Sequence, residues 1–270
     1  MLKDYGDVTD VQRSKIKVVC NFHTHNYLCG HAGGSVSDYV KRAVDYGYES
    51  IGISDHCIPP VGSYEPYFSL SNIDDEYLPQ FERARARYGD KIKIYSGAEI
   101  EYFDGHDDYY RELLKKLDYL VLGQHEFMNG IRRKNSFVDG DSESNFAAYC
   151  DSVKRAIKSG FFSVLAHPDL IFYRRLVPTE SIKQSFSEMI GVAANAGVPV
   201  ELNANGIRNH GFRYPTDLLV DCCQKHNAKV VISSDAHSPQ ELLDDCVTGM
   251  YVYAQAHGLN VVTEIPFFGE

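Results

Sequence analysis

The chain has 270 residues, of which 44% are hydrophobic and 24% charged, a balance typical of a globular protein with a buried core. The 27 basic and 37 acidic residues give a net charge of −10, which makes nucleic acid an unfavourable partner and means that an anionic substrate needs a local cationic centre. No apolar run approaches the roughly 20 residues that a membrane helix needs, and the polar N-terminal segment lacks the apolar core of a signal peptide.

Short apolar runs alternate along the chain with amphipathic stretches of helical period. The runs are rich in Val, Ile, Leu and aromatic residues, which is typical of buried parallel strands. They cover residues 16–22, 50–54, 93–100, 118–124, 161–166, 198–203 and 229–234. The helical stretches include residues 35–47, 73–89, 145–160 and 179–197. Predicted N-caps are Ser35 or Ser37 and Ser144, and predicted helix ends are Gly47, Gly89, Gly160 and Gly197.

Seven strand-then-helix units in series favour a parallel barrel, although a doubly wound open sheet fits the same alternation. A further apolar segment, residues 260–268, is a candidate for an eighth or edge strand. Residues 126–145 are polar and contain glycine, which predicts a long loop over one end of the fold. Since no flexible linker divides the chain, we expect one domain over residues 1–270.

Histidines and carboxylates gather at the ends of the predicted strands. In a parallel barrel the C-terminal strand ends converge on one face, so these side chains would form a ring, whereas an open sheet would place them in a row. Their placement therefore favours the barrel. The residues at these ends are His23, His25, His31, Asp55, His56, Glu99, His125, His167, Glu201, Asn203, Asp235 and His237.

The number and spacing of these groups indicate a metal site. Seven histidines together with Glu99 and Asp235 exceed the needs of one ion, so two or three ions are implied. Residues two apart on a strand point to the same face, which allows His23 and His25 to bind one ion together. Asp235 and His237 have the same spacing, and Glu99 is suited to bridge two ions.

Each of these motifs has a simpler interpretation when it is taken alone. A single H-x-H pair is more often incidental than a ligand pair. Asp55 and His56 are compatible with a hydrogen-bonded pair at a strand end. Glu99 is compatible with a carboxylate at the sheet edge whose hydrogen bonds are all satisfied. Independent surface residues would not all fall at the same end of successive strands. The combination therefore favours the metal cluster over the separate interpretations.

The ordered motifs HTH, SDH, GAE, GQH, AHPD and SSDAH resemble those of the polymerase and histidinol phosphatase (PHP) superfamily over residues 20–240. The stretch ELNANGIRNHGFRYP, followed by KVVISSDAHSP, is most similar to the histidinol-phosphate phosphatase branch. The resemblance implies a distorted (β/α)7 barrel with a trinuclear metal site at its C-terminal mouth. It implies one ion at His23, His25, Glu99 and Asp235, a second at Glu99, His125 and His167, and a third at His31, His56 and His237.

The resemblance also implies hydrolysis of a phosphate monoester, in particular L-histidinol phosphate in histidine biosynthesis. Two or three divalent ions of zinc, manganese or iron would lower the pKa of a coordinated water and neutralise the phosphoryl oxygens. Planar, permanently charged donors suit a dianionic phosphate. The predicted catalytic residues are Arg208, Arg174 and Asp235. Arg213 is a weaker candidate, Arg175 fits a solvated surface residue, and Asp55 and His210 are candidates for the general acid.

Two other functions remain open from the sequence. One is a phosphoesterase of the same superfamily that acts on another small phosphate ester or a nucleotide end, which residues 57–75 and 126–142 would decide because they should line the pocket. The other is a metal-binding barrel without catalysis. Seven scattered cysteines without a CxxC pair indicate reduced thiols, so we expect a cytoplasmic protein with no membrane partner. The oligomeric state is left open.

Overall fold

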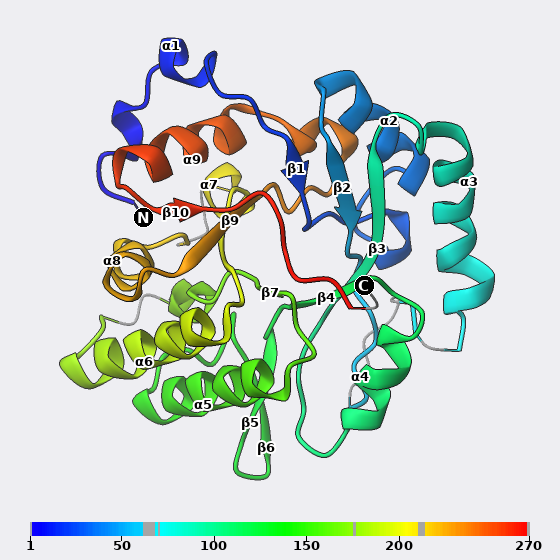
Figure 1. Ribbon diagram of the computed structural model, residues 1–270. Coiled ribbons are helices and arrows are strands. Elements are labelled where there is room, and N and C mark those ends of the chain that lie inside the picture. Colours follow the sequence, from blue (N-terminus) through cyan, green and yellow to red (C-terminus); the bar gives the residue numbers. More distant parts are fainter. Residues whose placement is uncertain (1, 62–67, 70, 175–176, 210–213, 269–270) are drawn as a thin grey trace.

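Eight parallel strands form one curled sheet, in which they follow each other in the order of the chain (Figure 1). The computed structural model describes residues 2–61, 68–69, 71–174, 177–209 and 214–268. The strands of the sheet are β1 (Cys20–Asn21), β2 (Ser50–Ile53), β3 (Lys93–Ile100), β4 (Tyr119–Leu122), β7 (Val164–Leu165), β8 (Val200–Asn203), β9 (Lys229–Ser233) and β10 (Asn260–Val261).

The sheet closes between the chain beyond β1 and the chain beyond β9. Thr24 forms a parallel bridge with Ala236, and the N–H of His25 donates to the carbonyl of Ala236 at 2.9 Å. β10 pairs with β9 alone, so within residues 260–268 only two residues form the expected edge strand. The expected barrel of the (β/α)7 type is therefore confirmed, and the doubly wound open sheet is excluded. The assignment of residues 1–270 to one domain stays a prediction.

Helices lie around the outside of the curled sheet (Figure 1). The four predicted stretches are confirmed as α2 (Val36–Tyr46), η3 with α3 (Ile73–Tyr77 and Leu78–Tyr88), α5 (Glu143–Ser159) and α6 (Glu180–Ala196). The sequence pattern did not single out α4 (Asp107–Leu114), α8 (Asp217–His226) or α9 (Asp245–Ala256). The shorter helices are η1 (Tyr5–Asp7), α1 (Asp10–Arg13), η2 (Tyr27–Cys29), η4 (Leu170–Arg174), α7 (Asn205–Arg208) and η5 (Pro239–Leu242).

The helix ends follow the predicted capping residues with one exception. Ser35 caps α2 by accepting the N–H of Asp38, whose side chain accepts the N–H of Ser35 in return. The prediction of Ser144 is wrong, because Ser142 caps α5 by accepting the N–H of Asn145 at 3.2 Å. The predicted glycines end all four helices; three of them adopt the left-handed conformation and Gly89 does not.

The prediction of a loop over residues 126–145 is wrong for the first half of that range. β5 (Glu126–Asn129) and β6 (Arg132–Asn135) form an antiparallel hairpin there, with Gly130 in the turn at φ +60°. The hairpin is tied to the end of β4, since the N–H of Ser136 donates to the carbonyl of His125 at 2.7 Å. It therefore returns the chain to the C-terminal mouth of the barrel.

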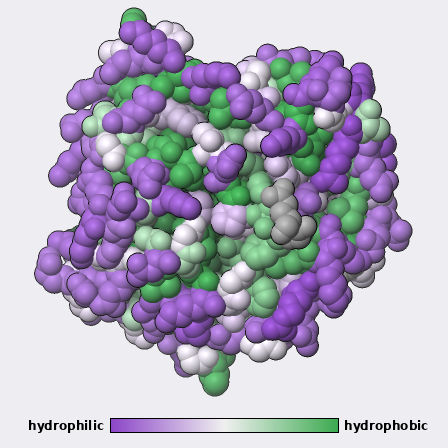
Figure 2. All heavy atoms as spheres, in the orientation of Figure 1, coloured by the Kyte–Doolittle hydropathy of each residue, from purple (hydrophilic) through white to green (hydrophobic). Residues whose placement is uncertain are grey.

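The inside of the barrel is apolar at its N-terminal end. The Tyr119 ring lies so close to Gly52 and Gly97 that a Cβ at either position would fall within 2.5 Å of a Tyr119 side-chain atom. Phe267, from the C-terminal segment that crosses this end in Figure 1, stacks on Tyr95 with ring centroids 4.0 Å apart. Figure 2 shows apolar residues toward the centre of this face and hydrophilic residues around its rim. The polar residues at the opposite end therefore lie above a closed apolar floor.

Candidate metal centre

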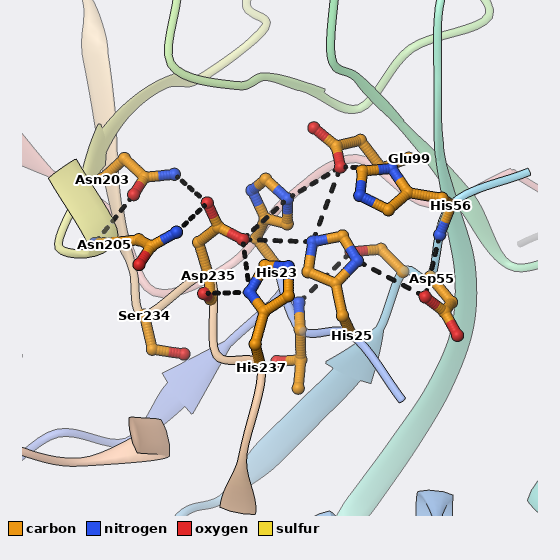
Figure 3. A network of polar contacts seen from close by, with 12 residues as sticks. His23, His25, Asp55, His56, Glu99, Asn203, Asn205, Ser234, Asp235 and His237 are labelled. Carbon is orange, nitrogen blue, oxygen red and sulfur yellow. Dashed lines mark hydrogen bonds and ion pairs between the residues drawn. The ribbon is translucent and has the colours of Figure 1, made fainter. Parts of the chain in front are cut away.

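The predicted ligands lie around one cavity of about 460 Å³ at the C-terminal mouth of the barrel. His25, Glu99 and Asp235 belong to its wall and are 4% exposed or less, while His23 is fully buried beside them (Figure 3). β1, β3 and β9 position these four side chains: Glu99 stands in β3, and the other three lie shortly beyond the C-terminal end of β1 or β9. The remaining predicted ligands in the wall are His31, His56, His125, His167 and His237.

Glu99 is the central carboxylate of the cluster. Its Oε2 lies 3.1–3.5 Å from one ring nitrogen each of His23, His25 and His56. Its Oε1 lies 2.9 Å from Nε2 of His167 and 3.4 Å from Nε2 of His125. The two oxygens thus face different histidines, which is the geometry that a bridging ligand requires.

Asp235 and the remaining histidines form the other side of the cluster. Oδ1 of Asp235 lies 3.1 Å from Nε2 of His25 and 3.7 Å from Nδ1 of His237. The ring of His31 lies 4.9 Å from that of His237 and 5.3 Å from that of His56, centre to centre. The structure therefore brings His31 next to both of the histidines with which it is expected to bind an ion.

Several buried ligand atoms at the centre have no hydrogen-bond partner among the described residues. They include Nε2 of His23 and Oδ1 of Asp235, which face each other at 3.7 Å. Both belong to a group with His25 in which the potential ligand atoms lie within 4.8 Å of one another. Such atoms are costly to bury unless something binds them. The imidazole and carboxylate donors fit divalent zinc, manganese or iron.

The electrostatics of the cluster favour positive charge within it. Burial by itself raises the pKa of Glu99, but the surrounding His23, His125 and His56 outweigh it and hold that pKa well below the usual range. Burial lowers the pKa of His23, yet Glu201, Asp235 and Glu99 raise it well above 6.5. Ionised carboxylates that stabilise a proton on His23 would stabilise a metal ion in the same place.

Carboxylates and amides behind the cluster hold its ligands. The sequence pattern placed Asp55 and Asn203 at strand ends but singled out neither Glu101 nor Asn205. Glu101 directly follows β3, two residues beyond Glu99, and its Oε1 is 3.2 Å from Nδ1 of His125. Asp55 lies 3.4 Å from Nδ1 of His25. Asn203 and Asn205 donate to Oδ2 of Asp235 at 3.0 and 3.3 Å (Figure 3). Contacts of this kind orient metal ligands.

Of the predicted arginines, only Arg208 has its side chain among the described residues. Arg208 ends α7, and its guanidinium donates to Asp244 at 2.7 Å and to the carbonyls of Ser234 and Glu241 at 3.1 Å. The side chain of Arg174 and all of Arg175, His210 and Arg213 lie outside the described residues. Among the described residues that line the cavity there is no lysine or arginine. From this part of the chain, an anion in the cavity would meet histidines and carboxylates, so its binding calls for metal ions.

Removal of metal is expected to make the thermal stability of the protein depend on pH. Although burial disfavours a charged imidazole, Asp235, Asp55 and Glu99 raise the pKa of His25 from 6.5 to about 9. A pKa that is higher in the folded state contributes stability that is complete below the unfolded pKa and lost as pH rises through the folded one. The melting temperature of chelator-treated protein should therefore fall between about pH 6.5 and 9. Zinc-loaded protein should change less, and equal slopes would contradict this expectation.

Known proteins with similar sequences include two relatives named probable histidinol-phosphatase. The chain is 23% identical to a probable histidinol-phosphatase of Deinococcus radiodurans over 83% of this chain and 88% of that one. It is 26% identical to a probable histidinol-phosphatase of Schizosaccharomyces pombe over 82% and 81% of the two chains.

Solved structures share the fold. A putative histidinol phosphatase from Listeria monocytogenes matches with a TM-score of 0.69 and 18% identity, over 84% of this chain and 98% of that one. A histidinol phosphate phosphatase from Lactococcus lactis, complexed with zinc, L-histidinol and phosphate, matches with a TM-score of 0.68 and 15% identity, over 92% and 98%. In the described part of this chain, every helix is too short or too polar to cross a membrane. The PHP domain model matches residues 21–205, and the chain therefore belongs to the PHP domain family.

Proposed function

We propose that the protein is a metal-dependent phosphomonoester hydrolase that converts L-histidinol phosphate and water into L-histidinol and phosphate. The observation that carries the proposal is Glu99, a buried carboxylate whose two oxygens face five imidazoles at the mouth of a closed barrel. Membership of the PHP domain family and the relatives named probable histidinol-phosphatase support it. The zinc, L-histidinol and phosphate of the Lactococcus lactis structure support the choice of metal and substrate.

The chain's own residues would act mainly by holding charge in place. We assign three ions, to His23, His25, Glu99 and Asp235; to Glu99, His125 and His167; and to His31, His56 and His237. When bound, divalent ions supply a water of lowered pKa as nucleophile and neutralise the phosphoryl oxygens. Glu101 fixes the ring of His125 through its contact at 3.2 Å, and Asn203 and Asn205 fix Asp235.

The cavity suits a small substrate with a cationic leaving group. A volume of about 460 Å³ is within the range of small-molecule sites. Its wall includes the aromatic rings of Phe137 and Tyr214 and the carboxylates of Glu101 and Glu241. An imidazole and an amine, the two basic groups of L-histidinol, are attracted by aromatic faces and carboxylates. These features favour L-histidinol phosphate over a nucleotide end.

Metal analysis coupled to phosphate release tests the function. The purified protein should contain zinc, manganese or iron, release phosphate from L-histidinol phosphate, lose that activity with a chelator and regain it with the metal. A panel of small phosphate esters and nucleotides provides the comparison. Faster turnover of another ester would reassign the substrate, and bound metal without turnover of any ester would show a binding protein instead.

Arg208 remains our first candidate for a phosphate contact, which requires its guanidinium to leave Asp244. Arg208→Ala should raise KM about tenfold or more, because a hydrogen bond to a charged group contributes about 1.5–3 kcal/mol. Metal content should stay near that of the wild type. Asp244→Asn is the matched control, since it weakens the internal partner of Arg208 but keeps the guanidinium. An unchanged KM in Arg208→Ala would show that the arginine stabilises the loops and does not contact the substrate.

A further inference from the structure

Glu201, in β8, is a fully buried carboxylate to which no ion is assigned above. Its Oε1 lies 2.7 Å from Nδ1 of His23. Its Oε2 accepts the backbone N–H of His167 at 2.9 Å and Nδ2 of Asn203 at 2.9 Å. The same Nδ2 also donates to Oδ2 of Asp235 at 3.0 Å. One carboxylate thus reaches three predicted ligands, two directly and one through a single amide.

The contact with His23 decides which ring nitrogen is available to an ion. A carboxylate only accepts hydrogen bonds, so the proton of the neutral imidazole must lie on Nδ1. Nε2 then carries a lone pair, and it faces Glu99 at 3.3 Å and Asp235 at 3.7 Å. Glu201 therefore selects the tautomer that presents a lone pair to the centre of the cluster.

The other two contacts hold ligands whose backbone is unusual. His167 has φ +25° and Asp235 has φ +46°, in the left-handed region that side chains other than glycine rarely adopt. The two residues follow β7 and β9, and β8 lies between these strands in the sheet. Glu201, on the middle strand, therefore holds one ligand from each neighbouring strand in place. The backbone of each ligand has a conformation that it would rarely adopt without such contacts.

We propose that Glu201 is a positioning residue that preorganises the metal site by fixing the tautomer of His23 and the orientation of His167 and Asp235. The proposal rests on the proposed function only in so far as the cluster binds divalent ions. It does not depend on which phosphate ester is hydrolysed.

Glutamine at this position has nearly the same shape but cannot make the same contacts. Its one carbonyl oxygen and one NH2 group would replace two oxygens that accept three N–H donors. If the oxygen faces His167 and Asn203, the NH2 group meets Nδ1 of His23 and drives the proton to Nε2, the nitrogen that an ion needs. If the oxygen faces His23, the NH2 group opposes the two other donors. Either arrangement disturbs a predicted ligand.

The test is zinc binding by metal-stripped full-length protein, measured by competition with a chromophoric chelator. Glu201→Gln should bind zinc about 10–100-fold more weakly than the wild type. At saturating zinc its KM for L-histidinol phosphate should be unchanged, because Glu201 does not contact the cavity. In ¹⁵N spectra of the zinc-loaded proteins, in which His23 is neutral, the variant should show a shifted Nδ1 signal for His23. The matched control is Asp118→Asn. Asp118 directly precedes β4, at the end of the barrel away from the metal centre, and its carboxylate accepts the N–H of Ser96 at 2.7 Å. The zinc affinity of this control should equal that of the wild type.

A second variant keeps the test decisive if Glu201→Gln fails to fold. Asn203→Ala removes the amide between Glu201 and Asp235 and also the acceptor for the backbone N–H groups of Asn205 and Gly206, but it keeps the contacts of Glu201 with His23 and His167. It should weaken zinc binding less than Glu201→Gln does. Wild-type zinc affinity in either folded variant would overturn the proposal for the contact that the variant removes. Absence of phosphate release from every ester would refute the proposed function alone, since the comparison of zinc affinities does not require turnover.

Discussion

Replacing Glu99 by glutamine is expected to remove bound metal and to lower kcat for phosphate release on the order of 1000-fold or more. Glutamine keeps the volume of the side chain but offers a neutral amide where five imidazoles now face two carboxylate oxygens. The two ion sites that we assign to Glu99 would lose their shared ligand and a full negative charge. The NH2 group would also point a donor at the metal-facing nitrogens. Metal content by mass spectrometry and phosphate release measure the two effects.

A matched control separates this loss from a general effect of removing a carboxylate. Glu49→Gln removes a carboxylate that forms an exposed ion pair with Lys17, at 3.0 Å, next to the N-terminal end of β2. Exposed pairs contribute little to stability, so this variant should keep its metal and its kcat. Full metal content and wild-type kcat in Glu99→Gln would refute the bridging role of Glu99.

Adding a single methyl group at Gly123 is expected to be nearly as damaging. A Cβ on this residue would lie 2.1 Å from Oε1 of Glu99 and 2.6 Å from its Cδ and Cγ. Gly123 follows β4, and its backbone is packed directly against the carboxylate. The Glu99 side chain would have to move by about an ångström, and a misplacement of that size in an active site costs on the order of 100-fold in rate. Gly123→Ala should therefore lose metal affinity and kcat/KM while it stays folded.

The control for this substitution is a glycine in open surroundings. Gly6→Ala, in η1, places its Cβ where no atom lies within 4 Å, so it should leave both metal content and activity unchanged. The two variants add the same methyl group to the chain. If Gly123→Ala matched the wild type in metal affinity, the carboxylate of Glu99 would have room that the structure does not show.

The sequence predicted the barrel and the residues at its mouth because two simple signals coincide there. Apolar runs mark the strands, and parallel strands bring their C-terminal ends to one face. The hairpin was missed because β6 consists of Arg132, Arg133, Lys134 and Asn135, which show no alternation of apolar and polar residues. The Asn129–Gly130 pair in its turn was the available signal.

Contacts between side chains that are far apart in the chain could not be predicted from the sequence. Glu201 and His23 are 178 residues apart in the chain, and the closure of the barrel brings their atoms to 2.7 Å. Arg208 falls in the predicted loop region, but its direction is decided by Asp244, 36 residues later in the chain. Residue type and order along the chain identify a ligand, whereas the groups that orient it follow from packing.

The aromatic floor formed by Tyr119 and Phe267 has a consequence for the order of product release. Because that end of the barrel is plugged, substrate and products share the mouth at the C-terminal ends of the strands. The phosphoryl group would lie deepest, at the buried carboxylates, and the alcohol nearer the opening. The alcohol therefore leaves first and inorganic phosphate last. Added phosphate should compete with substrate for the free enzyme, whereas added L-histidinol should inhibit noncompetitively.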